Sequence, residues 1–362
     1  MTHPVAFQAL DADLFARALP LLDGEWLARD PDLAPVLPMV LARGVGQDWH
    51  KAGTFRHHLV GVARSLALWR QPREVRLLGL LHSVYGNAFV DLVKFDPARE
   101  RARLREQVGD EAEQLVYLFC TASRTEFVRK VIAGEVEPDG SVQLVAQRID
   151  PATAAAFIVV SMADSAEQWF SWQEDVYSGF PQLRQVPQAA HWMAALWPGP
   201  MRPASRMYTQ ISQLGAALQH PGLRDRLPTP PVFDRCRETL AEGDEAAAVA
   251  LYWSVISQDQ PLVQADAAIA TLEQAVRRNP WVGEPQMVLA QLYLIAGRQG
   301  EAKAAAEGAL QRFSEWGNAW DKRVQWDAWF AWARILRQGA LAGDWPERLD
   351  TLNNVALRDT GA

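Results

Sequence analysis

The sequence has little cysteine, no run of basic residues and no long hydrophobic segment. Its two cysteines, Cys120 and Cys236, lie far apart and form no CxxC pair, which excludes a disulfide framework and fits a reducing compartment. The net charge is −7, so the electrostatic signature of nucleic-acid binding is missing. The longest apolar run, residues 152–163, is well short of the ~20 residues that span a bilayer.

Targeting and nucleotide-binding signals are also missing. The first residues contain no basic region followed by an apolar core, so they do not read as a secretory signal. The sequence has no P-loop, no GxSxG, no GxGxxG and no HExxH motif. We therefore expect a cytoplasmic protein that has no membrane or nucleic-acid partner and none of the commonest catalytic motifs.

Helical and apolar sequence is abundant instead. The chain has 362 residues, 49% of them hydrophobic, which is enough for two cores. Its fifteen tryptophans cluster at residues 169–197 and 316–345, which favours packing between helices over a ligand surface. Only residues 136–145, around Pro138-Asp139-Gly140, alternate as a β-hairpin does. We predict an all-α fold with one small β-hairpin.

Prolines divide the chain. Several of them lie in residues 201–231, which we interpret as a linker between a first helical domain at 1–200 and a second at 232–362. In the second domain small residues recur with the period of 34 that is typical of tetratricopeptide repeats. The residues that carry this resemblance are Ala268, Ala275, Leu289, Ala290, Tyr293, Gly297, Ala302 and Ala309. The resemblance implies paired helices that present a surface to a peptide or protein partner.

Two histidines lie on the apolar faces of consecutive predicted helices. Thr54 is a suitable cap for a helix in which His58 recurs with the apolar residues at helical spacing. Pro72 suits the first turn of the next helix, which carries His82 on its apolar stripe and breaks at Gly86. We therefore expect both imidazoles to point into the core.

A carboxylate lies in the middle of a later apolar face. Pro151 begins a long helix in which Phe157 and Asp164 share one face. An unpaired buried carboxylate is costly, so Asp164 needs a cation, a metal ion or several donors. Two imidazoles and one carboxylate from three packed helices form the minimal facial set for a divalent transition metal. The alternative from spacing alone is that the histidines are ordinary core residues and that Asp164 pairs with an arginine.

The same residues resemble a known family. A histidine at 58, the His-Ser pair at 82–83 and an aspartate in the Ala-Asp context at 163–164 resemble the pattern of the HD superfamily. That superfamily comprises helical metal-dependent phosphohydrolases and oxygenases. The match covers about residues 50–175, includes LLGLLHSVYG and EAEQLVYLFC, and looks like a divergent branch with His-Ser in place of His-Asp. It implies an HD-type helical domain with His58, His82 and Asp164 as metal ligands.

Ser83 departs from that pattern. Serine is a poor, neutral ligand, which disfavours a dinuclear hydrolytic site and leaves a single ion with three protein ligands. Open positions on such an ion favour Fe(II), with O₂ and a chelating substrate, over Zn or Mn with activated water. We expect Tyr85 and Glu167 to be catalytic groups that handle protons. We expect His57 and Ser83 to contact the ligand side chains without binding the metal themselves.

The sequence thus predicts a mononuclear metal-dependent enzyme. A non-heme Fe(II) oxygenase or oxidase, acting on a small molecule or a carrier-bound substrate, stands slightly ahead of a metal-dependent phosphohydrolase. The remaining alternative belongs to another class: a non-catalytic helical scaffold whose repeats bind a partner protein or peptide.

Overall fold

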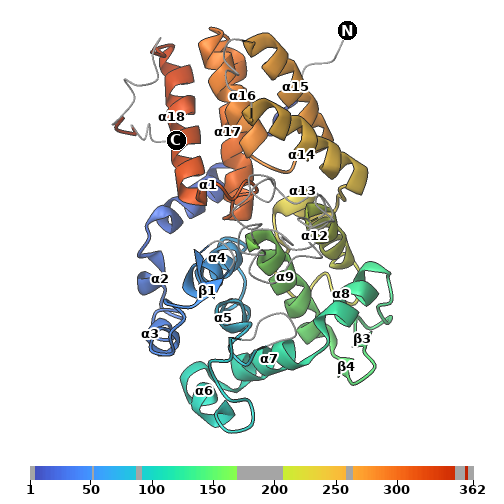
Figure 1. The fold of residues 1–362 in the computed structure, drawn as a ribbon. Coiled ribbons are helices and arrows are strands. Elements are labelled where there is room, and N and C mark those ends of the chain that lie inside the picture. Colours follow the sequence, from blue (N-terminus) through green and yellow to red (C-terminus); the bar gives the residue numbers. More distant parts are fainter. Residues whose placement is uncertain are drawn as a thin grey trace, which may run out of the picture. The chain divides into compact units, whose positions relative to one another are not determined.

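Helices make up most of the protein, as the sequence predicts. The computed structural model describes residues 5–50, 53–86, 92–168, 207–257, 264–346 and 355–357. Helices and two very short two-stranded sheets account for its regular structure, which confirms the all-α class with a small hairpin (Figure 1). In this described part, no helix combines the length and the apolar character that crossing a membrane requires.

The chain forms two compact units. Unit 1 consists of residues 1–18, 169–207 and 240–362, and unit 2 of residues 19–168 and 208–239. The chain therefore passes into unit 2 after its first helix and leaves it for the last time near residue 240, and residues 169–207 between the two parts of unit 2 are assigned to unit 1. The expected boundary at residue 200 and the first tryptophan cluster lie outside the described residues.

Unit 2 contains the predicted metal site. Its elements are η1 (Leu19–Leu22), α2 (Trp26–Arg29), α3 (Leu37–Leu41), β1 (Trp49–His50), β2 (Gly53–Thr54), α4 (Phe55–Leu68), α5 (Arg73–Leu81), α6 (Arg101–Val108), α7 (Asp110–Thr121), α8 (Arg124–Ile132), β3 (Val142–Gln143), β4 (Arg148–Ile149), α9 (Pro151–Glu167), α12 (Met207–Ala217) and α13 (Val232–Cys236).

Helix α9 is the core element of unit 2, and α4 and α5 pack against it. Asp150 caps α9 by accepting hydrogen bonds from the backbone N–H groups of Ala152 and Thr153 at 3.0 and 3.1 Å. Thr54 caps α4, where its side chain accepts the backbone N–H of His57. Gly79 allows α5 to lie close to α4, because a Cβ there would overlap the side chain of Leu66. These caps and contacts set the positions of the three helices that carry the candidate ligands.

The hairpin lies a few residues after its predicted place. Strand β3 pairs with β4 in the register Val142↔Ile149, so the Pro138-Asp139-Gly140 turn precedes the hairpin instead of connecting its strands. Gly140 has a φ of +93°, and a Cβ there would lie 2.5 Å from the carbonyl oxygen of Gly222. Gly140 of this turn thus allows a close contact with the backbone of Gly222, and the local alternation of residues does not reveal that contact.

Part of the expected linker belongs to the core of unit 2. Helix α12 buries Ile211 and Leu214, and Gly215 lies against Met162 of α9 and against Cys236. Residues 208–231 are therefore packed structure within unit 2 and not a free connection between domains. The prolines end and start short elements in this stretch, and its apolar residues supply the packing.

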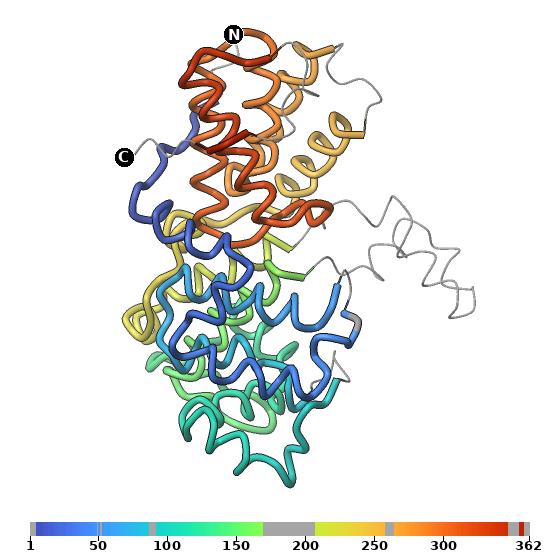
Figure 2. The backbone as a smooth tube through the Cα atoms, turned by 90° about the vertical axis from the view of Figure 1, so that its left-hand side faces the viewer, coloured from blue at the N-terminus to red at the C-terminus, as the bar shows by residue number. Residues whose placement is uncertain are grey.

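Unit 1 is a series of antiparallel helices: α1 (Ala12–Ala18), α14 (Glu242–Ile256), α15 (Ala265–Arg278), α16 (Glu284–Ile295), α17 (Gln299–Trp316) and α18 (Trp326–Ala342). From α14 to α18 each helix packs on the next one in sequence (Figure 2). The small residues at 268, 275, 302 and 309 are buried, and Gly297 turns the chain between α16 and α17 with a φ of +71°. This arrangement agrees with stacked helical hairpins.

The N-terminal segment packs on the end of this series. The backbone N–H of Asp11 donates to the buried side chain of Gln311 at 2.7 Å, and Phe15 stacks on Phe330 at 5.6 Å.

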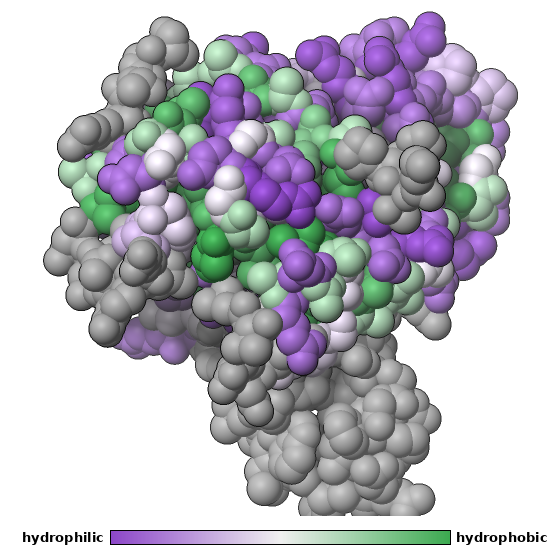
Figure 3. Space-filling model, turned by 90° about the horizontal axis from the view of Figure 1, so that it is seen from above, coloured by the Kyte–Doolittle hydropathy of each residue, from purple (hydrophilic) through white to green (hydrophobic). Residues whose placement is uncertain are grey.

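Seen from above, hydrophilic and hydrophobic residues are intermixed on the surface (Figure 3). A partner-binding surface of the repeats therefore stays a prediction.

Candidate metal centre

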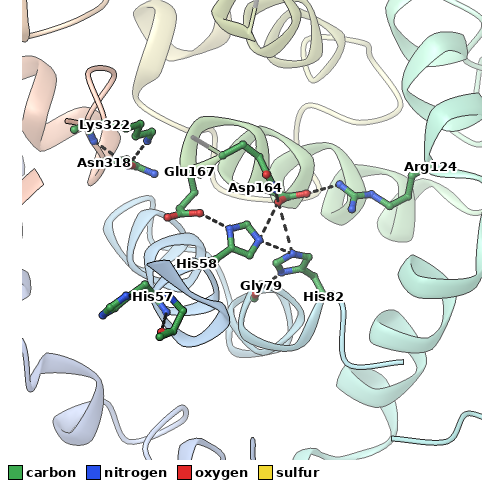
Figure 4. A network of polar contacts seen from close by, with 12 residues as sticks. His57, His58, Gly79, His82, Arg124, Asp164, Glu167, Asn318 and Lys322 are labelled. Atoms are coloured by element: carbon green, nitrogen blue, oxygen red, sulfur yellow. Dashed lines mark hydrogen bonds and ion pairs between the residues drawn. The ribbon is translucent and has the colours of Figure 1, made fainter. Parts of the chain in front are cut away.

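The three predicted ligands meet at one place in unit 2 (Figure 4). His58 comes from the first half of α4, His82 follows the last residue of α5 as its C-cap, and Asp164 lies in the last turn of α9. All three are buried, and one ligand atom of each lies within 4.8 Å of the others. The Nε2 atoms of His58 and His82 are 3.1 Å apart. Oδ1 of Asp164 lies 3.3 Å from Nε2 of His58 and 3.6 Å from Nε2 of His82.

These spacings suit a single ion. A triangle with sides of 3.1, 3.3 and 3.6 Å has a point about 1.9 Å from all three corners. Bonds from divalent transition metals to imidazole nitrogen and carboxylate oxygen are about 2.0–2.2 Å long. An ion slightly to one side of the plane of the three atoms would therefore be within bonding distance of each. The three ligands would occupy one face of it.

The hydrogen bonds made by the Nδ1 atoms leave Nε2 of both rings facing the centre of the cluster. Nδ1 of His82 lies 2.8 Å from the backbone carbonyl oxygen of Gly79, which can only accept, so Nδ1 carries the hydrogen. Nδ1 of His58 contacts the carboxylate of Glu167 and donates to it. In both neutral rings Nε2 is then the acceptor. Two Nε2 acceptors facing each other at 3.1 Å require a proton or a cation between them.

Without a metal ion, a proton fills that role. Burial lowers the pKa of His58, but the nearby carboxylates of Glu167 and Asp164 outweigh it and raise this pKa to about 9. Burial lowers the pKa of His82 to about 4, so this ring is neutral. The proton on His58 therefore lies between Nε2 of His82 and Oδ1 of Asp164. A divalent cation bound by the same three atoms would replace this proton.

Asp164 also has two partners outside the triad. Arg124, from the start of α8, donates to Oδ2 of Asp164, and Gln168 donates to Oδ1 at 2.8 Å. Burial would raise the pKa of Asp164, but the Arg124 guanidinium and the two histidines hold it well below its usual range. The arginine pairing considered from the sequence is thus present together with the converging ligands, because each uses a different oxygen of the carboxylate.

The other predicted site residues fall in different places. Glu167 is part of the site, but it contacts the far side of the His58 ring. Ser83 is buried directly after His82. His57 is exposed and takes part in the capping box at the start of α4, pointing away from the triad (Figure 4). The hydroxyl of Tyr85 donates to Glu113 at 2.8 Å, in a separate network that includes Arg101. The structure therefore does not bring Tyr85 or His57 to the three ligands.

Sequence reasoning missed three residues near the centre. The ring of His50 lies 4.6 Å from that of His58, because the pairing of β1 with β2 turns this strand toward α4. No periodic signal marks His50 or Arg124. Gln168, in contrast, follows Asp164 by four residues, a spacing at which helical side chains meet, so the sequence could have revealed it.

Comparison with known proteins adds one finding. Residues 39–124 match the model of a family described as a domain of unknown function, DUF6817. The matched stretch includes His58, His82 and Arg124 and ends before Asp164. No curated protein and no solved structure matches the chain at a significant level.

Proposed function

We propose that unit 2 holds a mononuclear divalent transition-metal centre with His58, His82 and Asp164 as ligands, and that the protein is a metal-dependent enzyme. One observation carries this proposal: three buried atoms that can ligate a metal, Nε2 of His58, Nε2 of His82 and Oδ1 of Asp164, lie 3.1–3.6 Å apart. The resemblance of the same residues to the HD superfamily supports it. The two buried cysteines, both free, fit a cytoplasmic location.

Fe(II) is the metal that we favour. Two histidines and one carboxylate on one face are the ligand set of non-heme Fe(II) oxygenases, and they leave positions open for O₂ and substrate. Bound there, Fe(II) would supply one-electron and O₂ chemistry. The chain's own groups hold the ligands rigidly: Glu167 and the carbonyl of Gly79 orient the rings, while Arg124 and Gln168 hold the carboxylate. The aromatic rings of Phe55 and Phe119 lie beside the two histidines and help to exclude water.

A second candidate is favoured by the contact between Arg124 and Asp164. This ion pair gives the buried carboxylate a partner without any metal, as a purely structural cluster would require. The protein would then be a non-catalytic helical scaffold whose repeats bind a partner. A metal-dependent phosphohydrolase is the alternative use of the same centre, since that is a principal activity of the HD superfamily.

Metal analysis separates these functions. Protein purified without chelator, and protein loaded anaerobically with Fe(II), should contain about one iron per chain. Nitric oxide should then give the S = 3/2 electron paramagnetic resonance signal of an Fe(II) centre with an open position. His82→Ala should bind no iron and is the matched control.

Bound zinc or manganese together with hydrolysis of an aryl phosphate would favour the phosphohydrolase over the oxygenase. Absence of metal, with no change of melting temperature on adding chelator, would favour the scaffold.

A further inference from the structure

Gly61 is an unusual residue at its position. It lies in the interior of α4, three residues after His58, and it is buried. Glycine is less favourable than alanine inside a helix, because it loses more conformational freedom on folding. Its φ lies in the ordinary helical range, so the backbone conformation does not require glycine. The reason for glycine must therefore lie in what packs against it.

The side chain of Glu167 occupies the space that an alanine would need. A Cβ on residue 61 would lie 2.6 Å from Cγ, 3.0 Å from Oε1 and 3.2 Å from Cδ of Glu167. Non-bonded carbon atoms in contact are about 3.5–4.0 Å apart, so an alanine and this conformation of Glu167 exclude each other. The glutamate thus crosses α4 at Gly61, and its carboxylate ends at Nδ1 of His58.

Helix α9 has little freedom to relieve such a clash. Glu167 lies in the same last turn of α9 as Asp164, which contacts both ligand histidines and Arg124. Moving this turn away from α4 would carry Asp164 out of the triad. An added methyl group at position 61 must therefore displace the glutamate side chain, the Asp164 carboxylate, or both.

We propose that Gly61 and Glu167 form a positioning pair that holds the His58 ring with Nε2 toward the centre. His82 needs no such device, because its Nδ1 donates to the carbonyl oxygen of Gly79, three residues earlier in the chain. His58 depends on a side chain from another helix, and that side chain reaches it across a residue without a Cβ. The consequence for metal affinity rests on the proposed function, whereas the orientation of the ring does not.

A double-mutant cycle tests the pair. Gly61→Ala should weaken binding of Co²⁺ tenfold or more and lower the melting temperature, because it displaces Glu167. Glu167→Ala should weaken Co²⁺ binding to a similar extent. In the Glu167→Ala background, Gly61→Ala should cause no further loss of affinity and should raise the melting temperature, since alanine is the better helix former. The methyl group added by Gly61→Ala should thus lower the melting temperature in the wild type and raise it in the Glu167→Ala background.

A spectroscopic measurement separates positioning from general destabilisation. In the metal-free wild type, ¹⁵N NMR of the histidine rings should show His58 with its Nδ1–H in a strong hydrogen bond. Gly61→Ala and Glu167→Ala should both lose that signal, while Glu167→Gln, which keeps an acceptor oxygen, should retain it. Gly243→Ala is the matched control, because a Cβ there meets nothing within 4 Å and should leave affinity and the His58 signal unchanged.

The results can refute each idea separately. If Gly61→Ala has the same effect on melting temperature with and without the Glu167 side chain, the two residues do not act as a pair. If the sign reversal and the NMR changes are found but the wild type binds no Co²⁺, Zn²⁺ or Fe²⁺, the positioning pair stands and the proposed metal centre does not.

Discussion

Each of the two units buries a cluster of ionisable side chains among its helices. The two clusters differ in whether each acceptor atom faces a hydrogen-bond donor. In unit 1, Oε1 of Glu284 accepts the backbone N–H groups of Trp320 and Asp321 at 2.6 and 3.1 Å. The carboxylate of Asp321 accepts the hydroxyl of Tyr252 at 2.7 Å and Nε of Arg323 at 2.9 Å. Every one of these contacts joins a donor to an acceptor.

In unit 2 the centre of the cluster brings together three atoms that can all accept a hydrogen bond. Two ring nitrogens and one carboxylate oxygen face one another, and a single proton is the only hydrogen that they share. Burial of charge does not by itself indicate a binding site, because both clusters are buried. The close approach of three atoms that can each ligate a metal is what separates the His58, His82 and Asp164 cluster from the unit 1 network, and our metal proposal depends on it.

Removing a ligand should have the largest effect. His82→Ala and Asp164→Ala should each abolish measurable metal binding, since two remaining ligands rarely hold an ion at micromolar concentrations. Isothermal titration with Zn²⁺ and Co²⁺ measures the change.

His57→Ala should bind metal as the wild type does, because His57 is exposed and points away from the triad. We expect the same of His50→Ala, whose ring is adjacent to the ligands without being one of them. Equal metal content in all variants would contradict the assignment.

Arg124→Gln should act in opposite directions on the two states of unit 2. The metal-free protein loses the cation beside a buried carboxylate, a change that costs about 3–5 kcal/mol when a buried pair is broken. The metal-loaded protein loses a repulsive positive charge next to the ion, so its affinity for Zn²⁺ should rise about tenfold. Chemical denaturation and metal titration measure the two effects. A fall in affinity would show that Arg124 orients Asp164 more than it competes with the metal.

Glu284→Gln should change how stability depends on pH. Burial, aided by the charge of Asp321, raises the pKa of Glu284 from its ordinary value of 4.5 to about 7. Between these values the folded state binds a proton that the unfolded state releases, so the free energy of unfolding falls as pH rises from 4.5 to 7. The total is on the order of 3 kcal/mol.

The glutamine variant lacks this titration while its amide oxygen can still accept both backbone hydrogens. It should lose the decline and be more stable than the wild type at pH 8, as urea unfolding at pH 5, 6, 7 and 8 would measure. Parallel pH profiles for the two proteins would show that Glu284 is not the group responsible.

Tyr252→Phe should have the smallest effect. It removes one hydrogen bond to Asp321 but leaves Arg323 in place, so we expect a loss of about 1 kcal/mol in the free energy of unfolding. Metal binding should not change. A loss above about 3 kcal/mol would mean that the unit 1 cluster depends on the Tyr252 hydroxyl for more than this one hydrogen bond.

Periodicity predicted that His58, His82 and Asp164 face the core, because each lies in or directly after a helix whose apolar face decides its direction. The spacing of His58 and Asp164 from apolar neighbours was sufficient to place both in the core. Hairpin position and the role of residues 208–231 were not predictable in this way, because both depend on contacts between segments distant in sequence. Arg124 and His50 reach the centre through such contacts as well.

By itself, the amino-acid sequence determined that this protein is helical, where its main helices begin and which three side chains face inward, because these follow from interactions within a few residues of each other. Only the tertiary structure decided that His58, His82 and Asp164 lie together, that Arg124 takes the second oxygen of Asp164 and that Glu167 crosses Gly61 to reach His58. Distances of 3.1–3.6 Å between helices depend on how whole side chains pack, and no local pattern encodes that packing.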